Sequence, residues 1–69
     1  MYAAKAEIVG NVWRVVAQEG DHVAAGDLVA VLETMKMEIP VHAGEAGTVR
    51  LKVAEGQIVQ EGDVIAEIG

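Results

Sequence analysis

An all-β fold is the class that this sequence predicts, in the form of a flattened barrel-sandwich of two antiparallel sheets with pseudo-twofold internal symmetry. Short runs rich in β-branched residues recur along the chain and give about eight strands at the close spacing of a sandwich. Glycine and aspartate punctuate these runs at the turns. No window of helical length carries apolar residues at helical spacing without a glycine interrupting it.

The expected strands follow the apolar runs in order. The longer ones cover residues 12–17, 28–33, 37–43, 49–54 and 64–68. Shorter strands are expected around residues 7–8, at Val23 and at Ile58–Val59. The segment 28–41 joins two apolar runs through a polar centre, so a hairpin is expected there.

An internal repeat organises the chain. Each copy reads glycine, strand, Glu-Gly, a short hydrophobic step, Gly-Asp and a second strand. Most matches are separated by 36 residues, and the first by 37: Gly10 with Gly47, Glu19-Gly20 with Glu55-Gly56, Gly26-Asp27 with Gly62-Asp63, and Ala30 with Ala66. Two copies are too few for a solenoid. We therefore expect two halves, related by a pseudo-twofold, that cover each other face to face.

The change of separation from 37 to 36 places one extra residue in the first copy, between Gly10 and Gly20. A β-bulge near residues 13–15 explains it economically. The bulge leaves the facing of Trp13 open, and a core or half-buried packing role is preferred for it over a binding role.

Size and composition limit the functions available. The 69 residues form one domain, 1–69, with no room for a separate catalytic domain. A net charge of −6 and only one Trp and one Tyr argue against nucleic acid as a partner. No secretion signal or membrane-spanning run is visible, and cysteine is absent, so a cytoplasmic protein is expected. The two histidines, without cysteine, offer too few ligands for zinc.

Met35 and Lys36 stand where the hairpin turns. Two-residue hairpin turns favour backbone with φ > 0, which Asn or Gly normally supplies. This chain uses Gly or Asp at nearly every other turn, yet has Met-Lys here. Residues that break a local rule mark function or stored strain. A Met-Lys-Met tripeptide alone would more often be an ordinary strand, but its place at the centre of the repeat favours a functional lysine.

The hexapeptide Glu33-Thr34-Met35-Lys36-Met37-Glu38 resembles the biotinylation signature of the biotinyl/lipoyl attachment family, in particular its biotin carboxyl carrier domains. The resemblance covers nearly the whole chain, since the Glu-Gly and Gly-Asp pairs fall where that family has its turns. Lipoyl domains usually carry Asp before the lysine and Ala after it. Thr34 replaces the more common Ala or Ser, and the chain has no room between residues 15 and 23 for the thumb loop of some carriers.

The resemblance implies that a biotin protein ligase attaches biotin covalently to Lys36, with Met35 and Met37 as further cofactor-site residues. It also implies that the carrier is not an enzyme: biotin carboxylase loads the cofactor, and a carboxyltransferase passes the carboxyl group on. Glu33, Thr34 and Glu38 are candidate ligase-recognition residues; for Glu38, simple solvation is an equal alternative. A lysine amine in water has a pKa of about 10.4, so the ligase must desolvate Lys36 before its amine can attack.

Two other functions stay open at this point: a lipoyl-type acyl carrier, against which the methionines argue, and an unmodified interaction module of the same fold. The domain itself is expected to be monomeric, with no membrane partner. Met1 and the lack of a linker favour a free-standing polypeptide, although a domain excised from a carboxylase would have the same sequence. The carboxyl acceptor is not encoded here, because the transferase recognises it.

Overall fold

The computed structural model describes residues 1–35 and 37–69; the expected attachment residue, Lys36, lies outside them. The described chain forms strands and turns, with none of its residues in a helix that could cross a membrane. The strands are β1 Tyr2–Lys5, β2 Gly10–Val15, β3 His22–Val23, β4 Leu28–Thr34, β5 Met37–His42, β6 Gly47–Leu51, β7 Ile58–Val59 and β8 Val64–Ile68.

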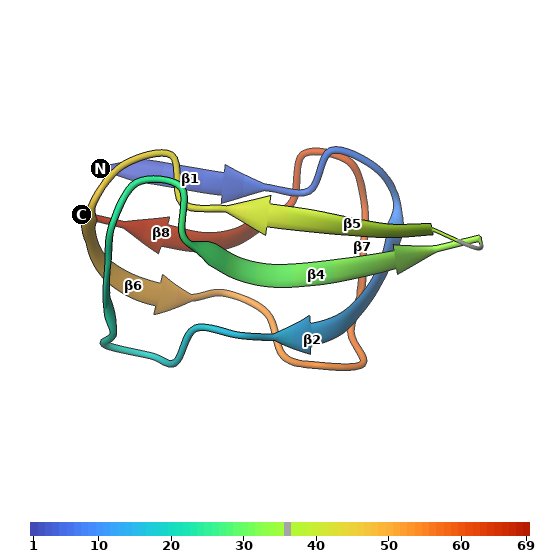
Figure 1. Cartoon of the computed structure of the whole chain (residues 1–69). Helices are drawn as coiled ribbons and strands as arrows, with labels where there is room; N and C mark the ends of the chain where they lie inside the picture. The colour runs from blue at the N-terminus through green and yellow to red at the C-terminus, as the bar shows by residue number, and fades with distance from the viewer. Residues whose placement is uncertain (36) are drawn as a thin grey trace.

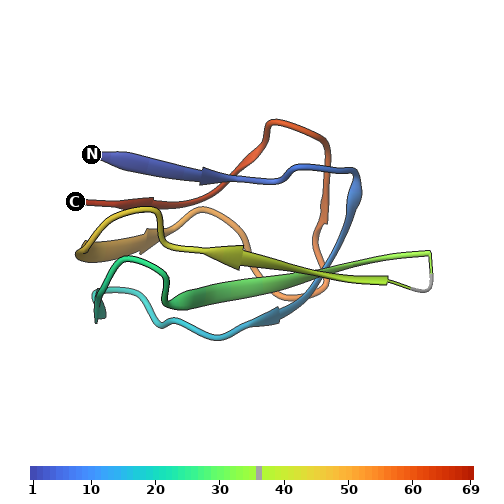
Figure 2. The same ribbon diagram turned by 45° about the horizontal axis from the view of Figure 1, so that its top comes forward.

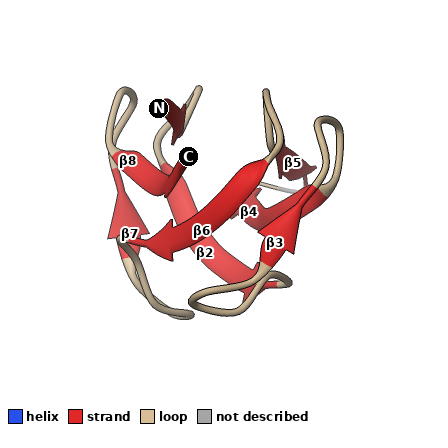
Figure 3. Ribbon diagram, turned by 90° about the vertical axis from the view of Figure 1, so that its left-hand side faces the viewer, coloured by secondary structure: helices blue, strands red, loops and turns tan. Residues whose placement is uncertain are grey.

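Two antiparallel four-stranded sheets pack against each other (Figure 1). The strand order is β1-β8-β6-β3 in the first, which we call the terminal sheet because β1 and β8 hold the chain ends. It is β5-β4-β2-β7 in the second, the hairpin sheet. A view along the long axis shows the strands arranged around one core (Figure 3). The predicted all-β sandwich is confirmed, as two open sheets rather than a closed barrel.

The two halves of the repeat interleave. Strands β1 and β3 of the first half lie in the terminal sheet, whereas β2 and β4 lie in the hairpin sheet. The second half is also divided between the sheets, but with the sheets exchanged: β5 and β7 lie in the hairpin sheet, and β6 and β8 lie in the terminal sheet. Strands β1 to β4 thus correspond to β5 to β8, and the pseudo-twofold exchanges the two sheets. The expectation that the two halves would cover each other face to face is wrong, because antiparallel pairing between the halves contributes to both sheets.

The core lies between the sheets and is aliphatic. Its largest fully buried side chains are Leu32, Ile65, Ile68, Val12, Val29, Val49 and Val59. No polar or charged side chain is buried among the described residues. Since a chain this small buries only about 60% of its unfolded surface, stability depends on packing these few residues without gaps.

The repeated turns show why the sequence repeats Gly-Asp. Gly26 and Gly62 have φ of 93° and 90°, a left-handed backbone that glycine adopts without strain. The next residue, Asp27 or Asp63, accepts a hydrogen bond through Oδ2 from the backbone N–H three residues before it, at 2.9 and 2.8 Å. Each turn therefore closes with its backbone donor satisfied.

Two details of the strand prediction are wrong. Residues 7–8 form a bend, and the first strand is β1 (Tyr2–Lys5), which pairs with β8. The strands expected at 12–17 and 49–54 are β2 and β6. Each begins two residues before its expected start and also ends before its expected end. They include Gly10 and Gly47 because these glycines pair with β7 and β3. Register with a neighbouring strand, rather than local propensity, fixes these boundaries.

The predicted bulge is confirmed in β2. The register with β4 shifts between Val12 and Arg14, so Trp13 and Arg14 together oppose Val31. Trp13 is 43% exposed, and the Arg14 guanidinium lies 5.0 Å from its ring centroid. A core role for Trp13 is therefore wrong, since the bulge turns its side chain to the outer face of the hairpin sheet. The half-buried packing role, the other alternative expected, agrees with a residue that is more than half covered and packs under Arg14.

Candidate functional site: the end of the β4–β5 hairpin

Strands β4 and β5 form the longest hairpin, and it points away from both chain termini (Figures 1 and 2). Their pairing runs from Leu28 opposite His42 to Thr34 opposite Met37. Only two residues, Met35 and Lys36, join the last pair. The two-residue connection expected from the sequence is confirmed; the expected φ > 0 at its two residues stays a prediction.

The hairpin extends beyond the hydrophobic core. Leu32, which pairs with Ile39, is fully buried, and it is the last residue of β4 that reaches the core. Past this pair, Met35 is 89% exposed and Met37 is also exposed. Two large apolar side chains in water are unfavourable by about 1.5–3 kcal/mol each relative to full burial. The exposure of both methionines at this end of the domain makes it a candidate contact surface.

Each predicted site residue in the described chain lies in this segment. Thr34 and Met37 form the last strand pair, and Met35 begins the turn. Glu33 and Glu38 form the pair before it, directly opposite each other and both exposed. Like charges in such a pair are destabilising. The structure brings these five residues together; Lys36, between Met35 and Met37 in sequence, is not described.

Gly10 supports the base of this segment, and sequence reasoning did not recognise that role. A Cβ added at Gly10 would lie 2.9 Å from the backbone carbonyl oxygen of Glu33 and 3.8 Å from Cβ of Thr34. Glycine therefore lets β2 approach the hairpin where it leaves the body. The signal was present in the sequence as the first glycine of the repeat, but its neighbour at residue 33 depends on strand pairing.

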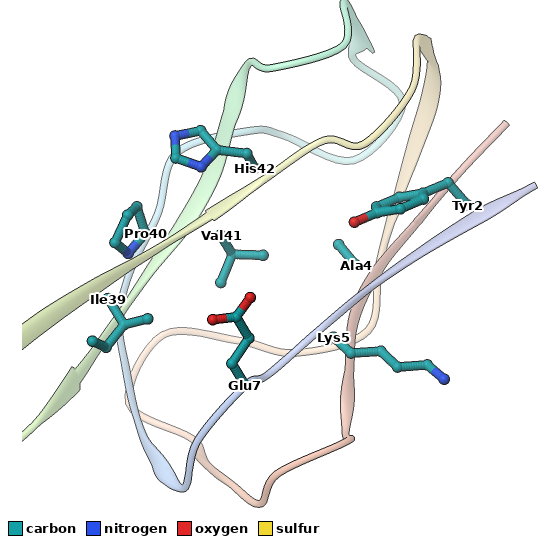
Figure 4. Close-up of a pocket in the computed structure, with 8 residues that line it drawn as sticks. All are labelled: Tyr2, Ala4, Lys5, Glu7, Ile39, Pro40, Val41 and His42. Carbon is teal, nitrogen blue, oxygen red and sulfur yellow. The ribbon is translucent and has the colours of Figure 1, made fainter.

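A groove elsewhere on the molecule does not reach the hairpin end. It runs between the edge strands β1 and β5 and is lined by Tyr2, Ala4, Lys5, Glu7, Ile39, Pro40, Val41 and His42 (Figure 4). None of these residues belongs to the segment 33–38. A covalent group carried at the hairpin end would thus project from an exposed tip, and the residues around that tip fit attachment rather than enclosure.

Comparison with known proteins agrees with this geometry. The family model of the biotin/lipoyl domain, described as biotin-requiring enzyme, matches residues 3–68. This chain belongs to the biotin/lipoyl attachment family. It is a carrier domain rather than a catalytic part.

Relatives of similar length belong to the same group. The chain is 52% identical to a biotinylated protein TB7.3 homolog of Mycobacterium leprae over 65 residues, which covers 93% of this chain and 92% of that one. It is 46% identical to a biotin/lipoyl attachment protein of Bacillus subtilis, covering 90% of this chain and 86% of the other.

A solved structure of a much larger protein shares the fold. The urea carboxylase of Kluyveromyces lactis matches 99% of this chain with a TM-score of 0.91 and 39% identity. The chain spans 6% of that carboxylase. The match therefore concerns one small domain of the larger enzyme.

Proposed function

We propose that residues 1–69 form a single biotin carrier domain in which a biotin protein ligase joins biotin to the side-chain amine of Lys36. One observation supports this most: the hairpin ends in a two-residue connection in which Lys36 stands in sequence between the exposed Met35 and Met37, in a member of the biotin/lipoyl attachment family. Biotin, once attached, supplies a ring that accepts and releases a carboxyl group.

The chain's own contribution is a hairpin whose end, next to Lys36 in sequence, extends beyond the core. The core ends at Leu32, and beyond it Met35 and Met37 are exposed. Tethering a cofactor to such a platform raises its effective concentration at the active sites that it visits. Attachment also removes one positive charge, so the formal net charge changes from −6 to −7, because four basic residues then oppose eleven acidic ones.

The ligase is proposed to recognise the segment around the lysine. Met35 and Met37 offer flexible apolar contacts. Glu33 and Glu38 offer a pair of carboxylates on one face, which a basic group of the ligase would neutralise. Thr34 is partly buried at the end of β4, and it fixes the spacing between the methionines and the glutamates.

The domain is proposed to make and break no bonds by itself and to act as a monomer in the cytoplasm. Its partners are then the ligase, a biotin carboxylase and a carboxyltransferase. Membership of a family whose domains lie within carboxylases supports association with such catalytic parts.

The direct test is co-expression with a biotin protein ligase, followed by intact mass and streptavidin capture. We expect a mass increase of one biotinyl group on the natural chain and none on the Lys36→Arg variant. The variant keeps the positive charge, so its loss of labelling reports the amine rather than the charge. Labelling that persists in Lys36→Arg would refute the assignment. Modification by a lipoate ligase instead would establish the acyl-carrier alternative.

A further inference from the structure

The outer faces of the two sheets differ although the pseudo-twofold makes them equivalent. Paired residues share a face of the sheet. On the hairpin sheet, the outer face carries an apolar cluster, Trp13, Val16, Leu28, Val31 and Pro40, which we call the outer apolar face. Two exposed basic or polar residues share this face: Arg14 lies opposite Val31 with its guanidinium over the Trp13 ring, and His42 lies opposite Leu28. Trp13, Val16 and Leu28 are exposed large hydrophobic residues, at 43%, 45% and 37%.

Two equivalent positions of the terminal sheet are charged. Val31 corresponds to Glu67 and Val16 to Lys52, each 36 residues later in the chain. The correspondence is structural, since Val16 and Lys52 donate their N–H groups to Val29 and Ile65, again 36 residues apart. Lys52 Nζ lies 3.4 Å from Glu67 Oε1, and Arg50 pairs with Glu67 across the strands. The fold therefore accommodates an ion pair at the terminal-sheet positions that correspond to Val16 and Val31.

The outer apolar face is continuous with the functional hairpin. Strands β4 and β5 contribute Leu28, Val31 and Pro40 to it, and the same two strands continue to the tip. Its border toward the tip is the exposed row Asn11, Glu33 and Glu38, whose two carboxylates face each other across the hairpin. A protein that covers both parts must offer apolar contacts to Trp13 and Val31, a polar or acidic partner to the Arg14 guanidinium beside them, and basic groups toward the tip.

We infer that the outer apolar face is the docking surface for the biotin protein ligase, which would present an apolar patch bordered by Lys or Arg opposite Glu33 and Glu38. The inference rests on the proposed function. The ligase is favoured over the carboxylase sites because it must bring its own active site to the lysine amine. The carboxylase active sites act on the biotin ring, which ends a longer arm than the lysine side chain alone. These sites can therefore stay farther from the sheet.

The test is steady-state biotinylation by purified ligase. The variant Val16→Lys/Val31→Glu transplants the ion pair of the terminal sheet and leaves the net charge unchanged. We expect its KM to rise by about tenfold or more with little change in kcat, since one buried apolar contact contributes roughly that factor. Trp13→Gln provides a second variant, expected to shift KM in the same direction. Thermal unfolding of each variant checks that it is folded.

The matched control is the reciprocal change Lys52→Val/Glu67→Val, which replaces the ion pair of the terminal sheet with apolar residues at the equivalent two positions. It should leave KM unchanged. Equal KM for the natural chain, Val16→Lys/Val31→Glu and Trp13→Gln would overturn the inference while biotinylation itself still supports the proposed function. Absence of biotin on the natural chain would instead refute the proposed function. Self-association of the natural chain that Val16→Lys/Val31→Glu abolishes, seen by sedimentation, would assign the face to a second copy and also overturn the inference.

Discussion

The carboxylate of Glu19 accepts a hydrogen bond from the backbone N–H of Leu51 at 2.7 Å, across the boundary between the two halves of the repeat. Its counterpart Glu55 accepts one from the N–H of Val15 at 2.9 Å. The short strands β3 and β7 pair with only the first residues of β6 and β2. The glutamates therefore satisfy donors that the neighbouring strand does not reach, which gives the repeated Glu-Gly a structural reason.

Replacing either glutamate with alanine should destabilise the domain. Glu19→Ala and Glu55→Ala each leave a strand N–H dependent on water, and we expect a loss of about 1 kcal/mol of unfolding free energy apiece. The matched glutamines keep an acceptor and should lose less. Urea unfolding of the four variants checks this, and alanine variants as stable as the natural chain would contradict it.

Gly10→Ala should destabilise the base of the hairpin. The added methyl would meet the Glu33 carbonyl oxygen at 2.9 Å, and a backbone atom moves only with its strand. We expect a loss of about 1–3 kcal/mol, as for other overpacked sites. Gly20→Ala is the control, because space around it is open and only its φ of 86° opposes the change. Denaturant midpoints compare the two, and a smaller effect at Gly10 would contradict the packing argument.

Pro40→Thr should promote self-association. Pro40 lies in β5, an edge strand of the hairpin sheet. Ala43 donates its N–H to Asp27 across the hairpin, so strand alternation turns the Pro40 nitrogen outward. A threonine would add an N–H donor to an exposed edge. Light scattering at high concentration measures the effect. Ala3→Thr on edge strand β1, the equivalent position, controls for the side chain, and equal association of both variants would argue against the missing donor.

Glu38→Gln should stabilise the domain slightly at low salt. Its partner Glu33 lies directly opposite, and removing one of two like charges is expected to add about 0.2–1 kcal/mol. High salt should remove the gain by screening. Glu67→Gln gives the opposite sign, because Glu67 lies beside Lys52 and opposite Arg50. Unfolding in urea at low and high salt measures both. A Glu38→Gln variant that is less stable at low salt would show that the carboxylate has a favourable contact.

Much of the architecture could be predicted from the sequence. The spacing of Glu-Gly and Gly-Asp located the turns, because left-handed backbone and local carboxylate acceptors demand those residue types. The single extra residue in the first copy located the bulge of β2. The site segment 33–38 was recognisable from its residues, although its assignment to Lys36 stays a proposal.

The sequence by itself determined the all-β class, the pseudo-repeat, the turn positions and the hairpin at 28–41, since these follow from local backbone preferences and apolar pattern. Tertiary structure alone decided which strands are neighbours. It interleaved the halves, began β2 at Gly10, placed that glycine under Glu33 and turned Trp13 outward. The physical reason is that such contacts join residues far apart in the chain. Their energies depend on register and on the packing of both sheets, which no local run of residues specifies.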